Sequence, residues 1–242
     1  MKISGSGPTF KGAVNPIVPL SIGQQAFLQM TATLAIMRFV EVSHPVEVGM
    51  HTYPGLPAPH VDILRTHDSG FYIASLHLCG NTGTYIDAPI HRFREGLDLA
   101  ALPLERLAHL PIEVIDVRSK GRAITHQELR NHHLQGKAVL FHTGWSAHWR
   151  TGQYFQQHPF LTKDCCQALL DAGANFAGID SLNIDDTNDD TRPAHTLLLQ
   201  AGVPICEHMT NLASLSAGGY LHAVPIAWVG GASFPVRAYV ME

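Results

Sequence analysis

The sequence predicts an α/β or α+β domain built on a substantial sheet, and three observations support this fold class. Short β-like runs recur along the chain, helix-like segments lie between them, and the strands outnumber the helices. The 242 residues are 45% hydrophobic and 15% charged, which suits one compact core with a modest polar shell. No unit of roughly 20–50 residues repeats, so the chain is neither a solenoid nor a propeller.

The expected strands begin near residue 39 and continue to the C-terminus. Each is a short apolar run of the kind that forms a strand. Together these runs cover residues 39–42, 73–78, 112–117, 138–142, 176–179, 203–206, 223–229 and 235–240.

Three helix-like segments lie between the expected strands. Thr125 and Glu128 form a capping box, in which a hydroxyl and a carboxylate satisfy the first free amides of a helix. A second helix is expected over residues 162–171, with Thr162 as its cap, and a third over residues 194–201. A glycine follows each of these two segments and favours the end of the helix there.

The first 36 residues differ from the rest of the chain. Residues 1–36 carry no marked helical or strand periodicity, and we expect a poorly structured extension before a domain over residues 37–242. The mildly apolar stretch at the end of this extension is shorter than the ~20 residues that cross a bilayer. The N-terminus also lacks the basic start and long apolar run of a signal peptide.

Composition and charge exclude several classes of partner. The net charge of −4, without any run of Lys and Arg, predicts no binding to nucleic acid or to an anionic membrane. The four cysteines form no C-x-x-C pair, which favours buried reduced thiols in a cytoplasmic protein. The sixteen histidines equal the Lys plus Arg total and favour metal or proton chemistry.

The most informative segment is residues 81–91, Asn-Thr-Gly-Thr-Tyr-Ile-Asp-Ala-Pro-Ile-His. Gly83 permits a tight turn, and Pro89 stiffens the chain after it. In an extended stretch alternate residues share a face, so three functional side chains of this segment are expected to project together. They are Tyr85, Asp87 and His91.

This segment resembles the signature of the cyclase family of metal-dependent hydrolases, H-x-G-T-H-x-D-x-P-x-H. Five of the seven fixed positions match, and Asn81 and Tyr85 stand in place of the two leading histidines. The resemblance runs in order from about residue 38 to 242. Its other matching segments are Val42-Ser43-His44-Pro45, Tyr53-Pro54-Gly55, Thr143-Gly144-Trp145, Gly178-Ile179-Asp180-Ser181, His195 with Leu198-Leu199, Glu207 with Asn211-Leu212, and Pro235-Val236-Arg237-Ala238.

The resemblance implies a fold, an assembly and a reaction. Members of the family fold as a swivelling β/β/α domain, here a mixed sheet with flanking helices, and assemble as homodimers or homotetramers. They hydrolyse C–N bonds in amides and small rings, with zinc or manganese activating a water. The partners implied for this chain are therefore a small-molecule substrate and further copies of itself.

The resemblance also implies two metal positions that share the aspartate of the signature. The second set of ligands is present here as Asp87, His195 and Glu207. The first set would need histidines at Asn81 and Tyr85. An asparagine carbonyl is a weak oxygen donor, and a phenol of pKa ~10 binds only if the metal forces its ionisation. We therefore expect at most one divalent metal, zinc or manganese.

The resemblance assigns His91 as the general acid–base group. Imidazole, which titrates near pH ~6.5, can take a proton from an attacking water and return it to a leaving nitrogen. Tyr85 and Asn81 could hydrogen-bond an oxyanion or orient the substrate, and this gives a version of the site that needs no metal. As alternatives, Asp87 could form a turn and Tyr85 could be a core aromatic residue.

Several neighbouring residues keep two interpretations. Trp145 and Phe93 could wall a pocket for a planar substrate, or they could pack in the core or an interface. Arg92 and Arg94 could hold a substrate carboxylate, although surface salt bridges are the simpler expectation. The acidic segment over residues 184–191 lacks the glycine and terminal glutamate of a calcium loop and is expected to be a solvated loop.

The leading hypothesis is a hydrolase that cleaves a C–N bond of a small amide or cyclic amide through metal-activated or His91-activated water. Loss of two ligands motivates a second hypothesis, a non-catalytic relative that keeps the pocket for ligand binding. A third is a metal-independent cyclase, dehydratase or isomerase that uses His91 and Tyr85.

Overall fold

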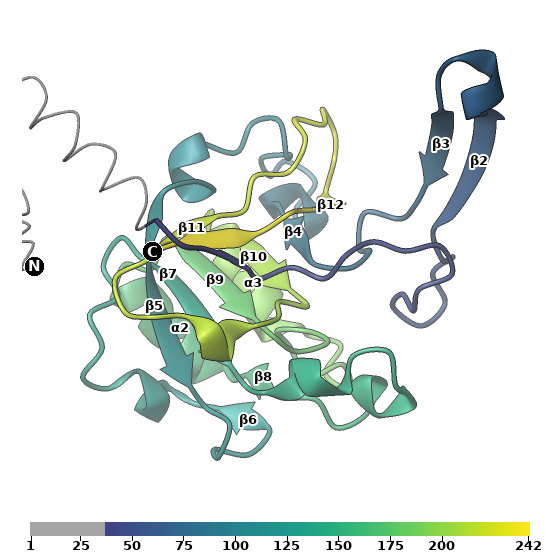
Figure 1. The fold of residues 1–242 in the computed structure, drawn as a ribbon. Coiled ribbons are helices and arrows are strands. Elements are labelled where there is room, and N and C mark those ends of the chain that lie inside the picture. The colour runs from purple at the N-terminus through teal and green to yellow at the C-terminus, as the bar shows by residue number, and fades with distance from the viewer. Residues whose placement is uncertain (1–36) are drawn as a thin grey trace, which may run out of the picture. The chain divides into compact units, whose positions relative to one another are not determined.

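The structure, a computed structural model, describes residues 37–242, so the extension expected over residues 1–36 lies outside the described residues. Within this range a nine-stranded mixed sheet forms the centre of the fold, in the order β1-β13-β11-β5-β7-β9-β10-β4-β12 (Figure 1). The predicted α/β class is confirmed. The strands are β1 (Phe39–Glu41), β4 (Tyr85–Asp87), β5 (Leu110–Asp116), β7 (Ala138–His142), β9 (Phe176–Ile179), β10 (Ile205–Glu207), β11 (Tyr220–His222), β12 (Ser233–Pro235) and β13 (Tyr239–Met241).

The central strands β5, β7, β9 and β10 run parallel to one another. Every residue of β7 and β9 is buried, as expected of a parallel sheet that is covered on both faces. Successive residues of β7 alternate between the two core clusters, with Leu140 in one and Phe141 in the other. Antiparallel strands flank this centre, and β4 with its neighbours carries the residues of the predicted site.

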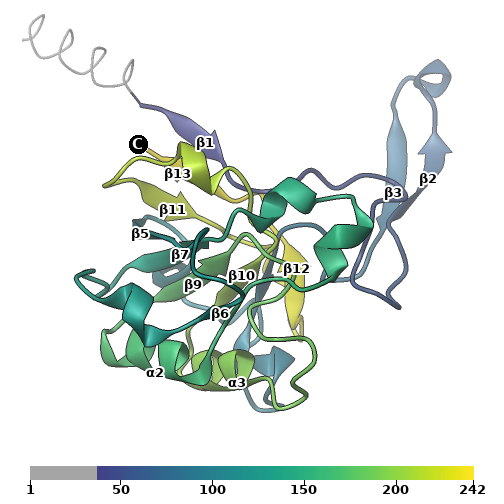
Figure 2. The same cartoon turned by 90° about the horizontal axis from the view of Figure 1, so that it is seen from below.

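Helices α2 (Lys163–Asp171) and α3 (Pro193–Gln200) lie side by side against one face of the sheet (Figure 2). Their buried side chains, among them Leu169 and Leu198, join the core cluster on that face. A fully buried side chain of this size stabilises the fold by about 1.5–3 kcal/mol relative to an exposed one. This packing fixes the first turn of α3, which carries His195.

The C-terminal segment links the two ends of the sheet. The run predicted as one strand over residues 235–240 forms β12 and β13, separated by residues 236–238. β12 pairs with β4 at one end of the strand order, whereas β13 pairs with β1 and β11 at the other. Because so few residues connect them, the two ends of the sheet lie close together and the sheet is curled.

The prediction of a strand over residues 223–229 is wrong. The strand of this region is β11, which precedes it, and residues 223–229 form a connection outside the sheet. Pro225 has no amide to donate to a neighbouring strand, and much of the apolar run faces outward. Its exposed large side chains are Val224, Ile226, Trp228 and Val229.

The helix predictions are confirmed for α2 and α3, which begin and end within one residue of expectation. Thr162 does not cap α2 through its side chain, because its hydroxyl donates to the Ile124 carbonyl at 2.8 Å. The capping box of Thr125 and Glu128 is present, but it opens only a short 3-10 helix, His126–Leu129. Among residues 37–242, no helix has both the length and the apolar character needed to cross a bilayer.

The run predicted over residues 73–78 forms β3 (Ile73–His77), but outside the main sheet. It pairs with β2 (His60–Arg65) in a two-stranded hairpin that projects from the body in both views (Figures 1 and 2). Every residue of β2 is exposed. The loop before the hairpin supplies Tyr53 to the cavity described next.

Candidate active site

Strand β4 forms the base of the candidate site because it lies between β10 and β12. The register places Tyr85 opposite Glu207 of β10 and Asp87 opposite Ser233 of β12. Residues two apart in a strand share a face, so Tyr85 and Asp87 point to the same side. A 3-10 turn then carries His91 back toward this side, with its Nδ1 3.7 Å from Asp87 Oδ1. The structure thus brings the three side chains together through a turn and not through a fully extended segment.

Two buried carboxylates flank His195 at the buried end of the site, and Asp87, His91 and His195 offer ligand atoms that lie within 4.8 Å of one another. His195 Nε2 lies 3.5 Å from Asp87 Oδ2 and 3.6 Å from Glu207 Oε1. Asp87 and Glu207 are fully buried, and Asp87 Oδ2 has no hydrogen-bond partner among the described residues. A buried carboxylate oxygen without a donor is costly, and a cation next to it would remove that cost. Two carboxylate oxygens and one imidazole nitrogen fit a divalent metal such as zinc or manganese.

Asp185 holds His195 in the orientation that this ligand set needs. Its Oδ2 lies 2.6 Å from Nδ1 of His195. The imidazole therefore carries its proton on Nδ1 and turns the lone pair of Nε2 toward Asp87 and Glu207, as in metal sites where a carboxylate orients a histidine ligand. The expectation of a solvated loop is wrong for Asp185, which is fully buried.

Neutral donors occupy the other oxygen of each buried carboxylate. Asp87 Oδ1 accepts hydrogen bonds from the Ser233 hydroxyl and, at 3.4 Å, from the Asn81 amide. Glu207 Oε2 accepts from the Tyr85 hydroxyl and, at 3.2 Å, from the Asn183 amide. Asp87 Oδ2 thus remains without a donor on the side on which His195 lies, whereas Glu207 Oε1, on the same side, also accepts from the Ile184 amide at 2.6 Å.

Ser233 also fixes the proton position on His91. Its hydroxyl has one proton, which it donates to Asp87, so its oxygen accepts from Nδ1 of His91 at 3.1 Å. Neutral His91 therefore carries its proton on Nδ1 and leaves Nε2 as an acceptor. A general base needs this tautomer.

Burial and neighbouring charges change the proton affinities of the cluster. Burial lowers the pKa of His195, but the hydrogen bond to Asp185 and the nearby charges of Glu207 and Asp87 outweigh it and raise this pKa to about 10. Burial raises the pKa of Glu207 to about 7, although the charge of His195 opposes the shift. Burial and the charges of Glu207 and Asp87 raise the pKa of Tyr85 well above its usual range, so its phenol is a neutral donor. The cluster needs positive charge, from a proton on His195 or from a metal that competes with it.

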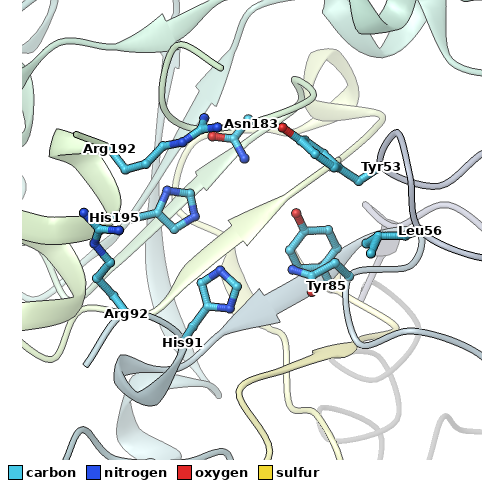
Figure 3. A pocket seen from close by; sticks show the side chains of 9 residues that line it. Tyr53, Leu56, Tyr85, His91, Arg92, Asn183, Arg192 and His195 are labelled. Carbon is cyan, nitrogen blue, oxygen red and sulfur yellow. The ribbon is translucent and has the colours of Figure 1, made fainter. Parts of the chain in front are cut away.

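A cavity of about 310 Å³ opens over this cluster (Figure 3). Its volume is at the lower end of the range for small-molecule sites. Asn81, Tyr85, His91 and His195 line it, whereas Asp87 and Glu207 contact His195 from its buried side. The other lining residues are Tyr53, Leu56, Arg92, Asn183 and Arg192.

Phe93 and Trp145, which were expected as walls for a planar substrate, are not among the residues that line this cavity. Phe93 packs against the core cluster of α2 and α3, because the turn before it lies on α3. Trp145 donates its indole N–H to the Tyr154 carbonyl at 3.0 Å. Tyr53 and Tyr85 supply the aromatic surface instead.

Sequence reasoning missed Ser233, Asn183 and the role of Asp185. Nothing near Ser233 in the sequence marks it, and only its pairing with Asp87 shows its place. Asn183 and Asp185 follow β9, and polar residues after the carboxyl end of a parallel strand are a signal that could have indicated them.

Comparison with known proteins places the chain among enzymes. Residues 40–186 match the sequence model of the family described as "Putative cyclase". The chain is 30% identical over 206 residues to a kynurenine formamidase of Bacillus cereus, with 84% of this chain and 96% of that protein covered. A kynurenine formamidase of Salinibacter ruber is 30% identical over 213 residues, covering 85% and 98%.

Solved structures share the fold. An isatin hydrolase bound to the product analogue thioisatinate has a TM-score of 0.79 at 21% identity, with 92% of this chain and 99% of that chain covered. A potential metal-dependent hydrolase with cyclase activity has a TM-score of 0.73 at 26% identity, covering 85% and 98%. Fold, site and relatives define a hydrolase that acts on carbon–nitrogen bonds other than peptide bonds. The chain belongs to the cyclase family, and the fold expected from that family is confirmed.

Proposed function

We propose that this protein hydrolyses the C–N bond of a small amide, either an N-formyl or N-acyl amine or a cyclic amide, in the cavity over Asp87, His195 and Glu207. The relatives support this substrate class, since one group is named for a formamide bond and a structural neighbour for isatin. Water adds across the bond, so that the carbonyl carbon leaves as an acid and the nitrogen as an amine.

The observation that carries the proposal is the free Asp87 Oδ2, buried and directed at a histidine whose tautomer Asp185 fixes. Asp87, His195 and Glu207 would hold one divalent metal, zinc or manganese. When bound, the metal supplies positive charge that polarises a carbonyl and lowers the pKa of water.

The same contacts support one metal and not two. A second metal would need the Asp87 oxygen to which the Ser233 hydroxyl already donates. Asn81 and Tyr85 replace the histidines that would complete that position, and the raised pKa of Tyr85 opposes a phenolate ligand.

His91 performs the proton transfers in this proposal. Nε2 takes a proton from the attacking water, and Ser233 steadies the ring through Nδ1. The same proton then passes to the nitrogen as the C–N bond breaks. Because the Tyr85 hydroxyl is committed to Glu207, Tyr85 orients that carboxylate. Asn81, whose bond to Asp87 is long at 3.4 Å, is the better candidate to bind the carbonyl oxygen.

The test combines metal analysis with activity on aryl formamides and cyclic amides. We expect one zinc or manganese per chain, lost in Asp87→Ala and in His195→Ala. His91→Ala should keep its metal but lose about 10²–10⁴-fold in kcat. His133→Ala, which changes an exposed histidine that does not line the cavity, is the matched control. Full activity after chelation, or in His91→Ala, would overturn the proposed mechanism.

A further inference from the structure

We propose that the cavity selects substrates that carry a carboxylate, which Arg92 and Arg192 bind at one side of the reacting bond. This inference rests on the proposed amide hydrolysis for the identity of that bond. Both arginines line the cavity, and Figure 3 shows them on either side of His195. Tyr53, Leu56 and Tyr85 lie across the cavity in the same view and offer an apolar surface.

Neither guanidinium forms an ion pair within the part of the chain that the structure describes. Among residues 37–242, no carboxylate oxygen lies within 4.0 Å of Arg92 or Arg192, although five other arginines have such partners. The carboxylate of Asp186, whose backbone carbonyl accepts from Arg192, pairs with Arg122 at 3.5 Å. Asp189 lies near enough for the charge of Arg192 to act on it, but its Oδ1 accepts from the amide and hydroxyl of Thr191.

Neutral acceptors nevertheless hold both side chains in place. Arg92 donates from Nε to the Thr196 hydroxyl at 3.2 Å and from Nη2 to the Thr191 carbonyl at 3.0 Å. Arg192 donates from Nη1 to the Asp186 carbonyl at 3.3 Å and from Nη2 to the Thr187 carbonyl at 3.4 Å. Each guanidinium has five N–H groups, so the remaining ones can bind the two oxygens of a planar carboxylate. These cations are oriented in advance but form no ion pair with the described residues.

The backbone of Arg192 is consistent with a functional position. It lies directly before α3 with φ 48° and ψ 61°, in the left-handed region that residues with a side chain rarely adopt. Residues in such conformations concentrate at binding and catalytic sites.

The charges of the site determine how such a substrate would lie. Asp87, Asp185 and Glu207 lie at the buried end and do not line the cavity, whereas Arg92 and Arg192 do, so the cavity wall presents permanent positive charge to an anionic group of the substrate. Binding of that group at Arg92 and Arg192 leaves the amide over His91 and directs the apolar part of the substrate toward Tyr53. A small aromatic amide with a carboxylate on its ring fits this arrangement of charge.

The test compares two substrates on the metal-loaded full-length protein: a formylated aminobenzoate, and the same compound with a methyl group in place of the carboxylate. We expect a KM for the carboxylate substrate at least tenfold below that of the neutral one. Arg92→Gln and Arg192→Gln should each raise the former KM about tenfold or more. The kcat of both substrates and the KM of the neutral one should stay within threefold, because these residues act away from the reacting atoms.

Two controls separate charge recognition from a folding defect. Arg94→Gln changes an exposed arginine that does not line the cavity and should behave as wild type. Arg192→Lys keeps the charge without the planar fork and should give an intermediate KM. Equal KM values for the two substrates in wild type, or a preference that survives in the double glutamine variant, would overturn the inference.

Benzoate binding tests the inference without turnover. Calorimetry should show benzoate binding to wild type and to Arg94→Gln, with at least tenfold weaker binding to the double glutamine variant. If no amide is hydrolysed but this pattern holds, the proposed function fails and the carboxylate site stands. If amides are hydrolysed but benzoate binds all variants equally, the carboxylate site fails and the proposed function stands.

Discussion

Asp185→Asn is the perturbation that tests the buried end of the site most directly. The Asp185 carboxylate is fully buried and contacts Nδ1 of His195 at 2.6 Å, the Ala194 amide at 2.6 Å and the His195 amide at 3.0 Å. An asparagine has the same shape but only one acceptor oxygen. In either orientation of the side chain, its NH₂ group would therefore face at least one N–H donor that the Asp185 carboxylate accepts from in wild type, and that donor would lose its acceptor.

The size of the effect follows from these contacts. A hydrogen bond to a charged group contributes about 1.5–3 kcal/mol, so the metal-free variant should lose roughly 2 kcal/mol of unfolding free energy. Loss of the partner that orients a histidine ligand lowers metal affinity by about 10–100-fold. We expect the Kd for zinc or manganese to rise by that factor, because the lone pair of His195 Nε2 is no longer directed at Asp87 and Glu207.

The assay is calorimetric titration of metal-free protein with zinc and with manganese, together with urea unfolding of the same samples. Asp190→Asn is the matched control, since Asp190 belongs to the same acidic segment but is exposed. Its metal affinity and stability should equal those of wild type. A metal affinity in Asp185→Asn within threefold of wild type would refute the orienting role of Asp185.

Three further predictions follow from other parts of the molecule. Asn81→His combined with Tyr85→His restores the ligands of the first position and should raise the metal content from one ion to two per chain by elemental analysis; content that stays at one would contradict the account of the altered signature. Burial and the charge of Arg150 lower the pKa of His44 to about 4. Below pH ~6.5 the unfolded chain therefore binds a proton that the folded chain does not, and the free energy of unfolding decreases as the pH is lowered. His44→Phe should remove this loss, up to about 2 kcal/mol between pH 7 and pH 5 in urea unfolding, and equal slopes would refute it. The expected homo-oligomer should use the hairpin, where Ile63 is 60% exposed; Ile63→Ser should lower the mass seen by light scattering, whereas a monomeric wild type would exclude this interface.

Much of the fold could be predicted because it depends on local patterns. The apolar runs of β7 and β9 are strands at the predicted positions, since both faces of a parallel strand are buried and nearly every residue is apolar. The same signal failed over residues 223–229, where an equally apolar run faces outward and Pro225 removes an amide. Composition within a run does not show whether a neighbouring strand exists to pair with it.

The sequence by itself determined which residues are the candidates for the chemistry. The spacing over residues 81–91 and the family resemblance identified Asp87, His91, His195 and Glu207 as candidates, because the segments that resemble the family follow one another in the family's order along this chain. The altered positions Asn81 and Tyr85 were also visible there, and they limited the expectation to one metal.

Only the tertiary structure decided how these groups are supported. Asp185 belongs to an acidic run that the sequence cannot distinguish from a solvated loop, yet the fold buries it against His195. Ser233 reaches Asp87 through strand pairing, and Arg192 enters the cavity through the turn before α3. Hydrogen bonds between residues far apart in the chain depend on strand register and helix docking. These arise from packing of the whole core, so no local pattern encodes them.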